Sequence, residues 1–117
     1  MAVDVQYRNK TLFVDKQPLK FDFEVGNAFS VDNNVVFLLK IPYEDETLKN
    51  IYCLNKNCQF LWQVQSVLEA YPDLTVELPF EGMNLCPNGK ISAYDFYGRN
   101  FEIDAYNGKI LGYKIVK

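Results

Sequence analysis

The residues best able to do chemistry in this chain are carboxylates, and seven of the fifteen lie in one segment that has few bases. Residues 41–89 contain seven Asp and Glu against two Lys, whereas residues 1–40 are neutral and residues 90–117 carry a net charge of +2. Residues 57–89 contain no Lys or Arg. An acidic segment without balancing bases creates a negative potential, which attracts a basic protein and disfavours nucleic acid.

We therefore expect this segment to form a contact surface for a positively charged protein. The expected contact residues are a tyrosine, the three acids that follow it in a predicted loop, and three acids further along the chain: Tyr43, Glu44, Asp45, Glu46, Asp73, Glu77 and Glu81. The solvated face of a β protein without a binding role would have the same composition. This alternative stays open at the level of sequence.

Catalysis is disfavoured by what the chain lacks. It has no His, which removes the commonest general base and the Ser-His and Cys-His nucleophilic pairs. Carboxylate pairs such as Glu77 with Glu81, or Asp95 with Glu102, would need a deep cleft to raise one pKa for glycoside hydrolysis. No glycine-rich phosphate loop or nucleophile elbow occurs. We predict a protein that is not an enzyme, with no catalytic residues and no cofactor.

The cysteines Cys53, Cys58 and Cys86 make an odd number, and the N-terminus lacks the layout of a secretion signal. Both observations favour the cytoplasm, where thiols stay reduced. Cys53 is expected to pack as a small hydrophobe on a strand, and a disulfide from it to Cys58 across a turn is conceivable. A structural metal is not expected without His ligands. No run of 18 uncharged apolar residues predicts a membrane span.

The elements that position these residues are predicted to be strands. With 117 residues, of which 49% are hydrophobic, the chain suits one globular domain over residues 1–117. Short alternating runs between turns predict an all-β antiparallel meander of about ten short strands, arranged as a sandwich or a partly open barrel. Val35–Leu39 is apolar on both faces and predicts a central strand. Only Ser66–Tyr71 is suited to a helical turn.

Two further patterns predict a strand and two turns. Leu19–Val25 alternates apolar and charged residues, which predicts one strand after a turn at residues 16–18. Asn88-Gly89 and Asn107-Gly108 predict type I′ hairpin turns, which need a positive φ at both central residues.

The aromatic residues of the C-terminal third give two expectations. Tyr94 and Phe96 share one face of a predicted strand and are expected to stack in the core. Tyr97 lies at the following turn and on the opposite face. Because Tyr is enriched at protein interfaces, Tyr97 and Arg99 are candidates for a second contact.

An internal repeat connects several of the predicted hairpins. Ile51–Val64 and Phe101–Lys114 share an apolar strand, an Asn or Asp, a tight turn and a second strand with an aromatic residue, and Leu12–Val25 is a looser copy. This form resembles the pyrroloquinoline-quinone type of β-propeller repeat, although Cys58 stands where that family has Gly. A closed propeller needs at least about four blades of some 40 residues. The resemblance therefore implies blade-like sheets without the quinone cofactor or its dehydrogenase activity.

In size, charge and blade-like hairpins such as Ile51–Val64, the chain also resembles the small β-rich immunity proteins of bacterial contact-dependent growth-inhibition systems. That resemblance implies a cytoplasmic protein that binds and neutralises the nuclease domain of a cognate toxin. The partner would be a basic protein, with acids of this chain covering the surface that otherwise takes nucleic-acid phosphates. The alternative is a stand-alone propeller-like scaffold or interaction module. The sequence leaves the oligomeric state open.

Overall fold

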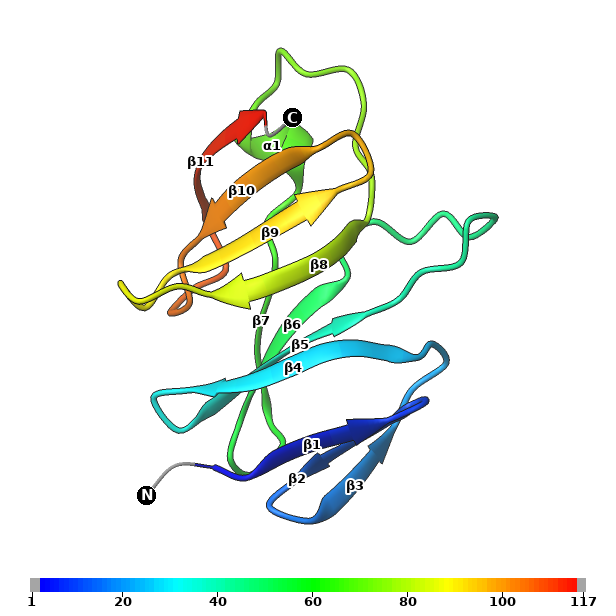
Figure 1. Cartoon of the computed structure of the whole chain (residues 1–117), viewed down its shortest axis with the longest axis vertical. Coiled ribbons are helices and arrows are strands. Elements are labelled where there is room, and N and C mark those ends of the chain that lie inside the picture. The colour runs from blue at the N-terminus through cyan, green and yellow to red at the C-terminus, as the bar shows by residue number, and fades with distance from the viewer. Residues whose placement is uncertain (1–2, 116–117) are drawn as a thin grey trace.

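The computed structural model describes residues 3–115, which form three antiparallel sheets stacked as layers (Figure 1). Within this range there are eleven strands and one short helix, so the predicted all-β antiparallel meander is confirmed. Their bounds are β1 (Val5–Arg8), β2 (Thr11–Val14), β3 (Gln17–Lys20), β4 (Val25–Val31), β5 (Asn34–Leu39), β6 (Ile51–Asn55), β7 (Phe60–Gln63), α1 (Val67–Ala70), β8 (Phe80–Leu85), β9 (Ile91–Asp95), β10 (Arg99–Ile103) and β11 (Ile110–Ile115).

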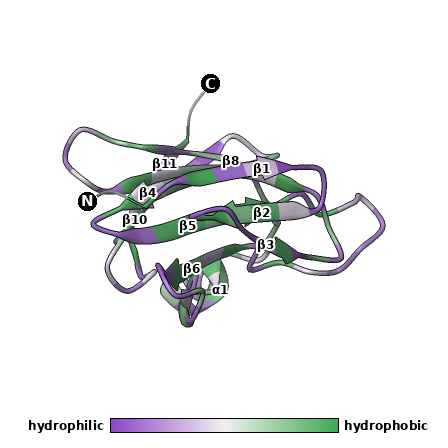
Figure 2. Ribbon diagram, turned by 90° about the horizontal axis from the view of Figure 1, so that it is seen from below, coloured by the Kyte–Doolittle hydropathy of each residue, from purple (hydrophilic) through white to green (hydrophobic). Residues whose placement is uncertain are grey.

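Each sheet is a meander in which consecutive strands are neighbours. The first sheet has the order β1-β2-β3, the middle sheet β4-β5-β6-β7, and the third sheet β11-β10-β9-β8. The first strands β1, β4 and β8 lie on one side of the stack (Figures 1 and 2). Hydrophobic residues are concentrated on the strands (Figure 2). The sheets do not close into a barrel, and the arrangement is a three-layer stack of blade-like sheets.

Strand β5 is the centre of the molecule because it contributes to two hydrophobic cores. Val35, Phe37 and Leu39 face the core between the first and middle sheets. Val36 and Leu38 face the core between the middle and third sheets. A strand buried on both faces needs apolar residues at every position, which confirms the prediction of a central strand from Val35–Leu39.

The predicted strand Leu19–Val25 is wrong, because the chain leaves the first sheet in the middle of it. The backbone N–H of Phe21 donates to the Lys10 carbonyl (2.9 Å), and that of Val25 donates to the Asn9 carbonyl (2.8 Å). These bonds fold the linker between β3 and β4 back over the turn that joins β1 to β2. Alternation alone did not distinguish this linker from a strand.

The type I′ turns occur at positions other than the predicted ones. Asp15-Lys16 (φ 47° and 70°) and Asp32-Asn33 (φ 48° and 69°) have positive φ at both central residues. The turn between β2 and β3 is therefore earlier than the predicted turn at residues 16–18. Three of these four residues are Asp or Asn, which take the left-handed conformation more readily than other non-glycine residues, and the fourth is Lys16.

The two Asn-Gly turns are not type I′, because only glycine has a positive φ in each of them. Gly89 has φ 82° and Gly108 has φ 76°. The Asn88 side chain accepts a hydrogen bond from the backbone N–H two residues later, and Asn107 does the same. Cys58 (φ 65°) takes the left-handed position in the equivalent hairpin, where the resembling repeat has Gly.

Gly108 is required by a neighbouring ring as well as by its backbone. A Cβ atom at this position would overlap the six-membered ring of Trp62, whereas a Cβ at Gly89 would meet nothing within 4 Å. We expect Gly108→Ala to lower the free energy of unfolding by about 2 kcal/mol, from the left-handed backbone and the overlap together.

The matched control for this substitution is Gly89→Ala, which has the backbone cost alone. We expect it to lower the free energy of unfolding by about 1 kcal/mol. Urea denaturation measures both values. Equal losses for the two variants would contradict the role of the Trp62 contact.

Tyr94 and Phe96 do not stack in the core, contrary to expectation. Phe96 is 70% exposed and Tyr94 is 43% exposed. Alternation along β9 instead buries Ile91, Ala93 and Asp95, because the inward position next to the turn is taken by Asp95 and its ion pair with a buried arginine. The aromatic cluster of this core is formed by Phe80, Phe101, Tyr71 and Tyr113.

The predicted helical turn is present as α1, which joins the middle sheet to the third sheet. Ser66 caps it, with its side chain accepting a hydrogen bond from the backbone N–H of Glu69. Within residues 3–115, no helix has the length and apolar composition needed to cross a bilayer.

Candidate protein-binding surface

The most prominent feature of the acidic segment is the loop of residues 40–50, which joins β5 to β6 and extends from the side of the stack (Figure 1). Leu38 pairs with Ile51, so the residues between these strands leave the sheet. Tyr43 is fully exposed, and the three acids that follow it, residues 44–46, are all exposed. The sequence therefore correctly placed these four residues together in one loop.

Hydrogen bonds within the loop give it a defined shape. The backbone N–H of Asp45 donates to the Pro42 carbonyl (3.0 Å). The backbone N–H of Thr47 donates to the Asp45 carboxylate (2.8 Å). Hydrogen bonds from the side chain and backbone of Thr47 hold the pKa of Asp45 below its usual value. Asp45 therefore keeps its negative charge to a lower pH than an ordinary aspartate.

The far end of the loop is fixed by Asn50, which is completely buried. Its Nδ2 donates to the carbonyls of Leu39 and Phe80 (both 2.8 Å), and its Oδ1 accepts from the backbone N–H of Phe80 (2.9 Å). One side chain thus ties the loop to the start of β8. Glu81 follows Phe80 directly and is exposed. The structure therefore places Glu81 next to the end of the loop of residues 40–50, which we call the acidic loop.

Glu77 and Asp73 belong to a different place, the connection between α1 and β8, which Figure 1 shows at the top of the molecule. Glu77 is half-buried, and its Oε1 accepts hydrogen bonds from the Ser66 hydroxyl (2.5 Å) and the backbone N–H of Leu68 (3.0 Å). Glu77 therefore stabilises the start of α1. Asp73 is exposed.

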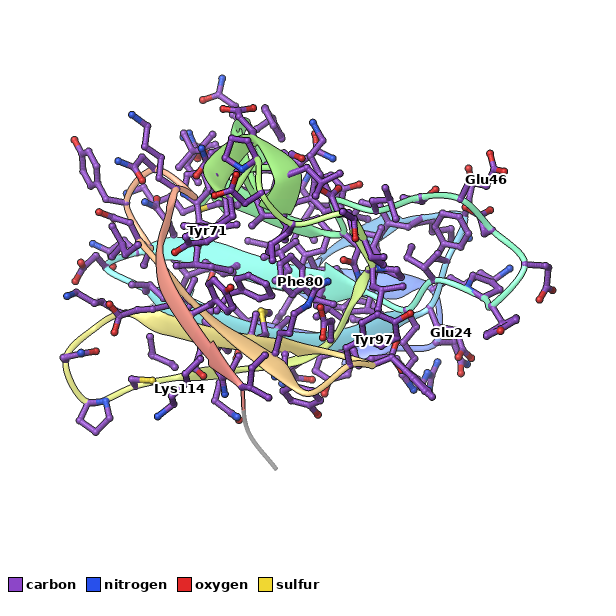
Figure 3. The ribbon with its side chains drawn as sticks, turned by 90° about the horizontal axis from the view of Figure 1, so that it is seen from above. Glu24, Glu46, Tyr71, Phe80, Tyr97 and Lys114 are labelled. Carbon is purple, nitrogen blue, oxygen red and sulfur yellow. The ribbon has the colours of Figure 1, made fainter. Side chains whose placement is uncertain are left out.

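Two residues that the charge pattern did not select lie toward the same side as the acidic loop. Figure 3 shows Glu24 and Tyr97 on the side of the molecule where Glu46 lies. Glu24 is exposed, and its carbonyl accepts a hydrogen bond from the backbone N–H of Lys40 at the start of the loop (2.7 Å). Charge counting missed Glu24 because residues 1–40 are neutral as a whole.

Tyr97 is held in place by a buried ion pair. The Arg99 Nε donates to the Asp95 carboxylate (2.7 Å), which also accepts hydrogen bonds from the backbone N–H groups of Tyr97 and Arg99. The guanidinium lies 5.7 Å from the ring centre of Tyr97 and 5.6 Å from that of Phe101. Tyr97 itself is 60% exposed. Arg99 is buried, so the expectation that it shares a surface contact with Tyr97 is wrong.

The acids on the side of the molecule where the acidic loop lies form no ion pairs among the described residues. Within residues 3–115, the ion pairs are Arg99 with Asp95 in the core and Lys90 with Glu102 on the surface. The carboxylates of Glu24, of the acidic loop and of Glu81 are thus available to an external cation. In the same range, no group of three His, Cys, Asp or Glu side chains is placed to hold a metal ion.

A comparison with protein families shows to which family the chain belongs. The profile described as "Domain of unknown function (DUF7957)" matches residues 2–115, which is nearly the whole chain. This chain belongs to that family. Comparisons with curated proteins and with solved structures gave no match.

The cysteines of this DUF7957 protein are free thiols. Cys53 packs in the core between the middle and third sheets, whereas Cys58 packs against the core on the other side of the middle sheet. The two side chains face opposite ways, so a disulfide between them is not formed. Burial raises the pKa of Cys53 to about 11, and burial together with the Asp15 charge raises the pKa of Cys58.

These positions predict a pattern of thiol labelling. At about pH 8, a maleimide should modify Cys86 and Cys58 in the folded protein and modify Cys53 only when urea is added, because Cys53 is buried and its thiol stays protonated. Mass spectrometry of the labelled peptides measures this. Labelling of Cys53 at the same rate as Cys86 without urea would show that this core opens.

Proposed function

We propose that this protein is an immunity-type protein that acts in the cytoplasm by binding and neutralising the nuclease domain of a cognate bacterial toxin. The observation that carries the proposal is the protruding, hydrogen-bonded loop that presents Tyr43 and three acids, none of which forms an ion pair within residues 3–115. We propose no catalytic role for the chain. The acids would occupy the basic surface of the nuclease that otherwise binds nucleic-acid phosphates.

The physical properties of the loop suit this role in two ways. Its internal hydrogen bonds and the Asn50 anchor reduce the conformational entropy that binding would otherwise cost. A fully exposed tyrosine is the kind of side chain that forms an energetic centre of an interface when a partner covers it. The surrounding carboxylates would accelerate association with a basic partner.

Asp73, Glu77 and Glu81 stay part of the proposed contact, but we expect them to contribute unequally to affinity. Glu81 adjoins the loop and Asp73 is exposed, so both can meet a large partner. The carboxylate of Glu77 is already hydrogen-bonded to the start of α1. We therefore assign Glu77 the smallest contribution to affinity.

Charge reversal in the loop tests the proposal. We expect E44K/E46K to slow association with the toxin domain by about tenfold or more and to reduce the salt dependence of that rate, because steering depends on these charges. The variant keeps Asp45 and therefore the hydrogen bond that orders the loop. Stopped-flow measurements at several salt concentrations give both quantities.

The matched control is D4K/E102K, which changes the net charge by the same amount. Asp4 precedes β1 and Glu102 is exposed on β10, and neither belongs to the acidic loop. We expect this variant to keep most of the wild-type association rate. Equal slowing by both variants would mean that net charge, and not the loop, controls binding.

The alternative function, a scaffold or interaction module without a toxin, is favoured by the stack of three blade-like sheets. An upstream reading frame that encodes a large toxin would support immunity, and its absence would support the scaffold.

A further inference from the structure

A second site lies in an open cavity of about 400 Å³ that is lined by residues of β7, of the start and interior of α1, and of the turn before β11, together with Lys49 from the end of the loop of residues 40–50. This volume is in the range of small-molecule sites in proteins. Lysines contribute two of its lining side chains, Lys49 and Lys109, and Glu69 contributes the one acid. The local charge is therefore positive in a chain whose net charge is −3.

The walls of the cavity are fixed by contacts between distant parts of the chain. The backbone N–H of Gln65 donates to the Gly108 carbonyl (3.0 Å), and its side-chain Oε1 accepts from the backbone N–H of Ile110 (2.9 Å). Gly108 packs against the Trp62 ring so closely that a Cβ would not fit. The backbone wall of the site is thus preformed, whereas a ligand would order the exposed side chains of Lys49 and Lys109.

Three nitrogen donors of the lining have no partner among the described residues. Neither Lys49 nor Lys109 forms an ion pair within residues 3–115. The Asn107 Oδ1 accepts from the backbone N–H of Lys109 (2.9 Å), and no hydrogen bond within that range uses the Asn107 Nδ2. Two ammonium groups and an amide N–H are suited to a phosphate, for which lysine acts as a point charge.

The remaining lining groups suit the rest of a nucleotide. Phe60 is 62% exposed although it is a large aromatic residue, and its ring offers a stacking surface for a planar base. Glu69 accepts a hydrogen bond from the Gln65 side chain at one carboxylate oxygen (3.3 Å). The other oxygen has no partner among the described residues and can accept a bond from a sugar hydroxyl.

From these groups we infer that the cavity binds a nucleoside monophosphate. Lys49, Lys109 and Asn107 hold the phosphate, Phe60 stacks on the base, and Glu69 accepts from the ribose. This site does not depend on the proposed immunity function, because none of these side chains belongs to the proposed toxin contact.

Titration of the ¹⁵N-labelled full chain with AMP, followed by NMR, tests this inference. The expected result is saturable shifts of the Gly108 and Gln65 amide signals with AMP, and weaker binding of adenosine and of inorganic phosphate given separately. We expect K49Q/K109Q to weaken AMP binding by about tenfold or more, because it removes both charge-assisted contacts. F60L should reduce the advantage of AMP over phosphate.

The control variant is K90Q/K114Q, which removes two exposed lysines that do not line the cavity. It should bind AMP as the wild type does. The inference would be overturned if AMP gave no saturable shift at millimolar concentration. It would also be overturned if K49Q/K109Q and K90Q/K114Q lost equal affinity, which would indicate non-specific attraction to lysines.

Discussion

Replacing Asn50 with alanine is expected to lower the free energy of unfolding by about 4 kcal/mol, because it leaves three buried backbone groups without partners. Those groups are the carbonyl of Leu39 and both the carbonyl and the N–H of Phe80, all within 2.9 Å of the Asn50 side chain. Asn50 is completely buried, so water does not replace the lost bonds. Urea denaturation gives the change.

The control for this prediction is Asn84→Ala on β8. Asn84 is exposed and makes no side-chain hydrogen bond within residues 3–115, so the free energy of unfolding should change by about 0.5 kcal/mol or less. A loss of less than about 1 kcal/mol for Asn50→Ala would show that the loop does not depend on this anchor. Asn50→Asp sets a buried carboxylate without a cation against the carbonyl oxygens of Leu39 and Phe80, so it should lower the free energy of unfolding at least as much as Asn50→Ala.

The second large effect is expected at the ion pair beneath Tyr97. Asp95→Ala should lower the free energy of unfolding by about 3 to 5 kcal/mol, because the buried Arg99 charge loses its partner. The same change removes the acceptor for the backbone N–H groups of Tyr97 and Arg99. Chemical denaturation measures the loss, which should hardly change with salt because the pair is shielded from solvent.

A double substitution separates the cost of an unpaired buried charge from the other effects of losing Asp95. Asp95→Leu with Arg99→Met removes both charges, so it should be more stable than Asp95→Ala alone by about 1 kcal/mol or more. Breaking the exposed pair by Lys90→Ala should cost about 1 kcal/mol or less. A double variant that is less stable than Asp95→Ala would show that Arg99 stabilises the core without its partner, through the rings of Tyr97 and Phe101.

Much of the fold could be predicted because the number of faces that a strand buries determines its pattern of apolar residues. The doubly buried β5 appears as an unbroken apolar run from Val35 to Leu39, and the hairpins appear as apolar runs around turn residues. The linker before β4 could not be predicted, because its path is set by hydrogen bonds to Asn9 and Lys10 and its alternation is that of a strand.

The candidate site was predictable to a similar degree. Tyr43 and the acids after it follow Pro42, which ends the apolar run, so their exposure was foreseeable. The role of Asn50 was not, since a single buried amide leaves no pattern in the sequence. Glu77 was chosen for its charge, although its partner Ser66 lies eleven residues away and only the folded chain brings them together.

The wrong prediction for Tyr94 and Phe96 is explained by which side chains of β9 face the core. The expectation that Tyr94 and Phe96 stack in the core rests on their sharing one face of the strand, but that face is the exposed one, because Asp95 between them points inward. Aspartate is rarely buried unless it is paired with a cation. Here the cation is Arg99, four residues further along the chain, and the sequence does not show that the two side chains pair in the core. Phe96 and Tyr97 are therefore left at the surface, where a partner can reach them.

The most direct test of the proposed immunity function is affinity capture, using the wild type, E44K/E46K and D4K/E102K as baits against the co-expressed products of neighbouring genes. Mass spectrometry identifies what each bait holds. The proposal predicts a one-to-one complex with a basic domain of nuclease character. The wild type and D4K/E102K should hold it, rising salt should weaken it, and E44K/E46K should lose it. A captured protein that is acidic, or a basic one that both variants hold equally, would contradict the acidic loop as the toxin-binding surface.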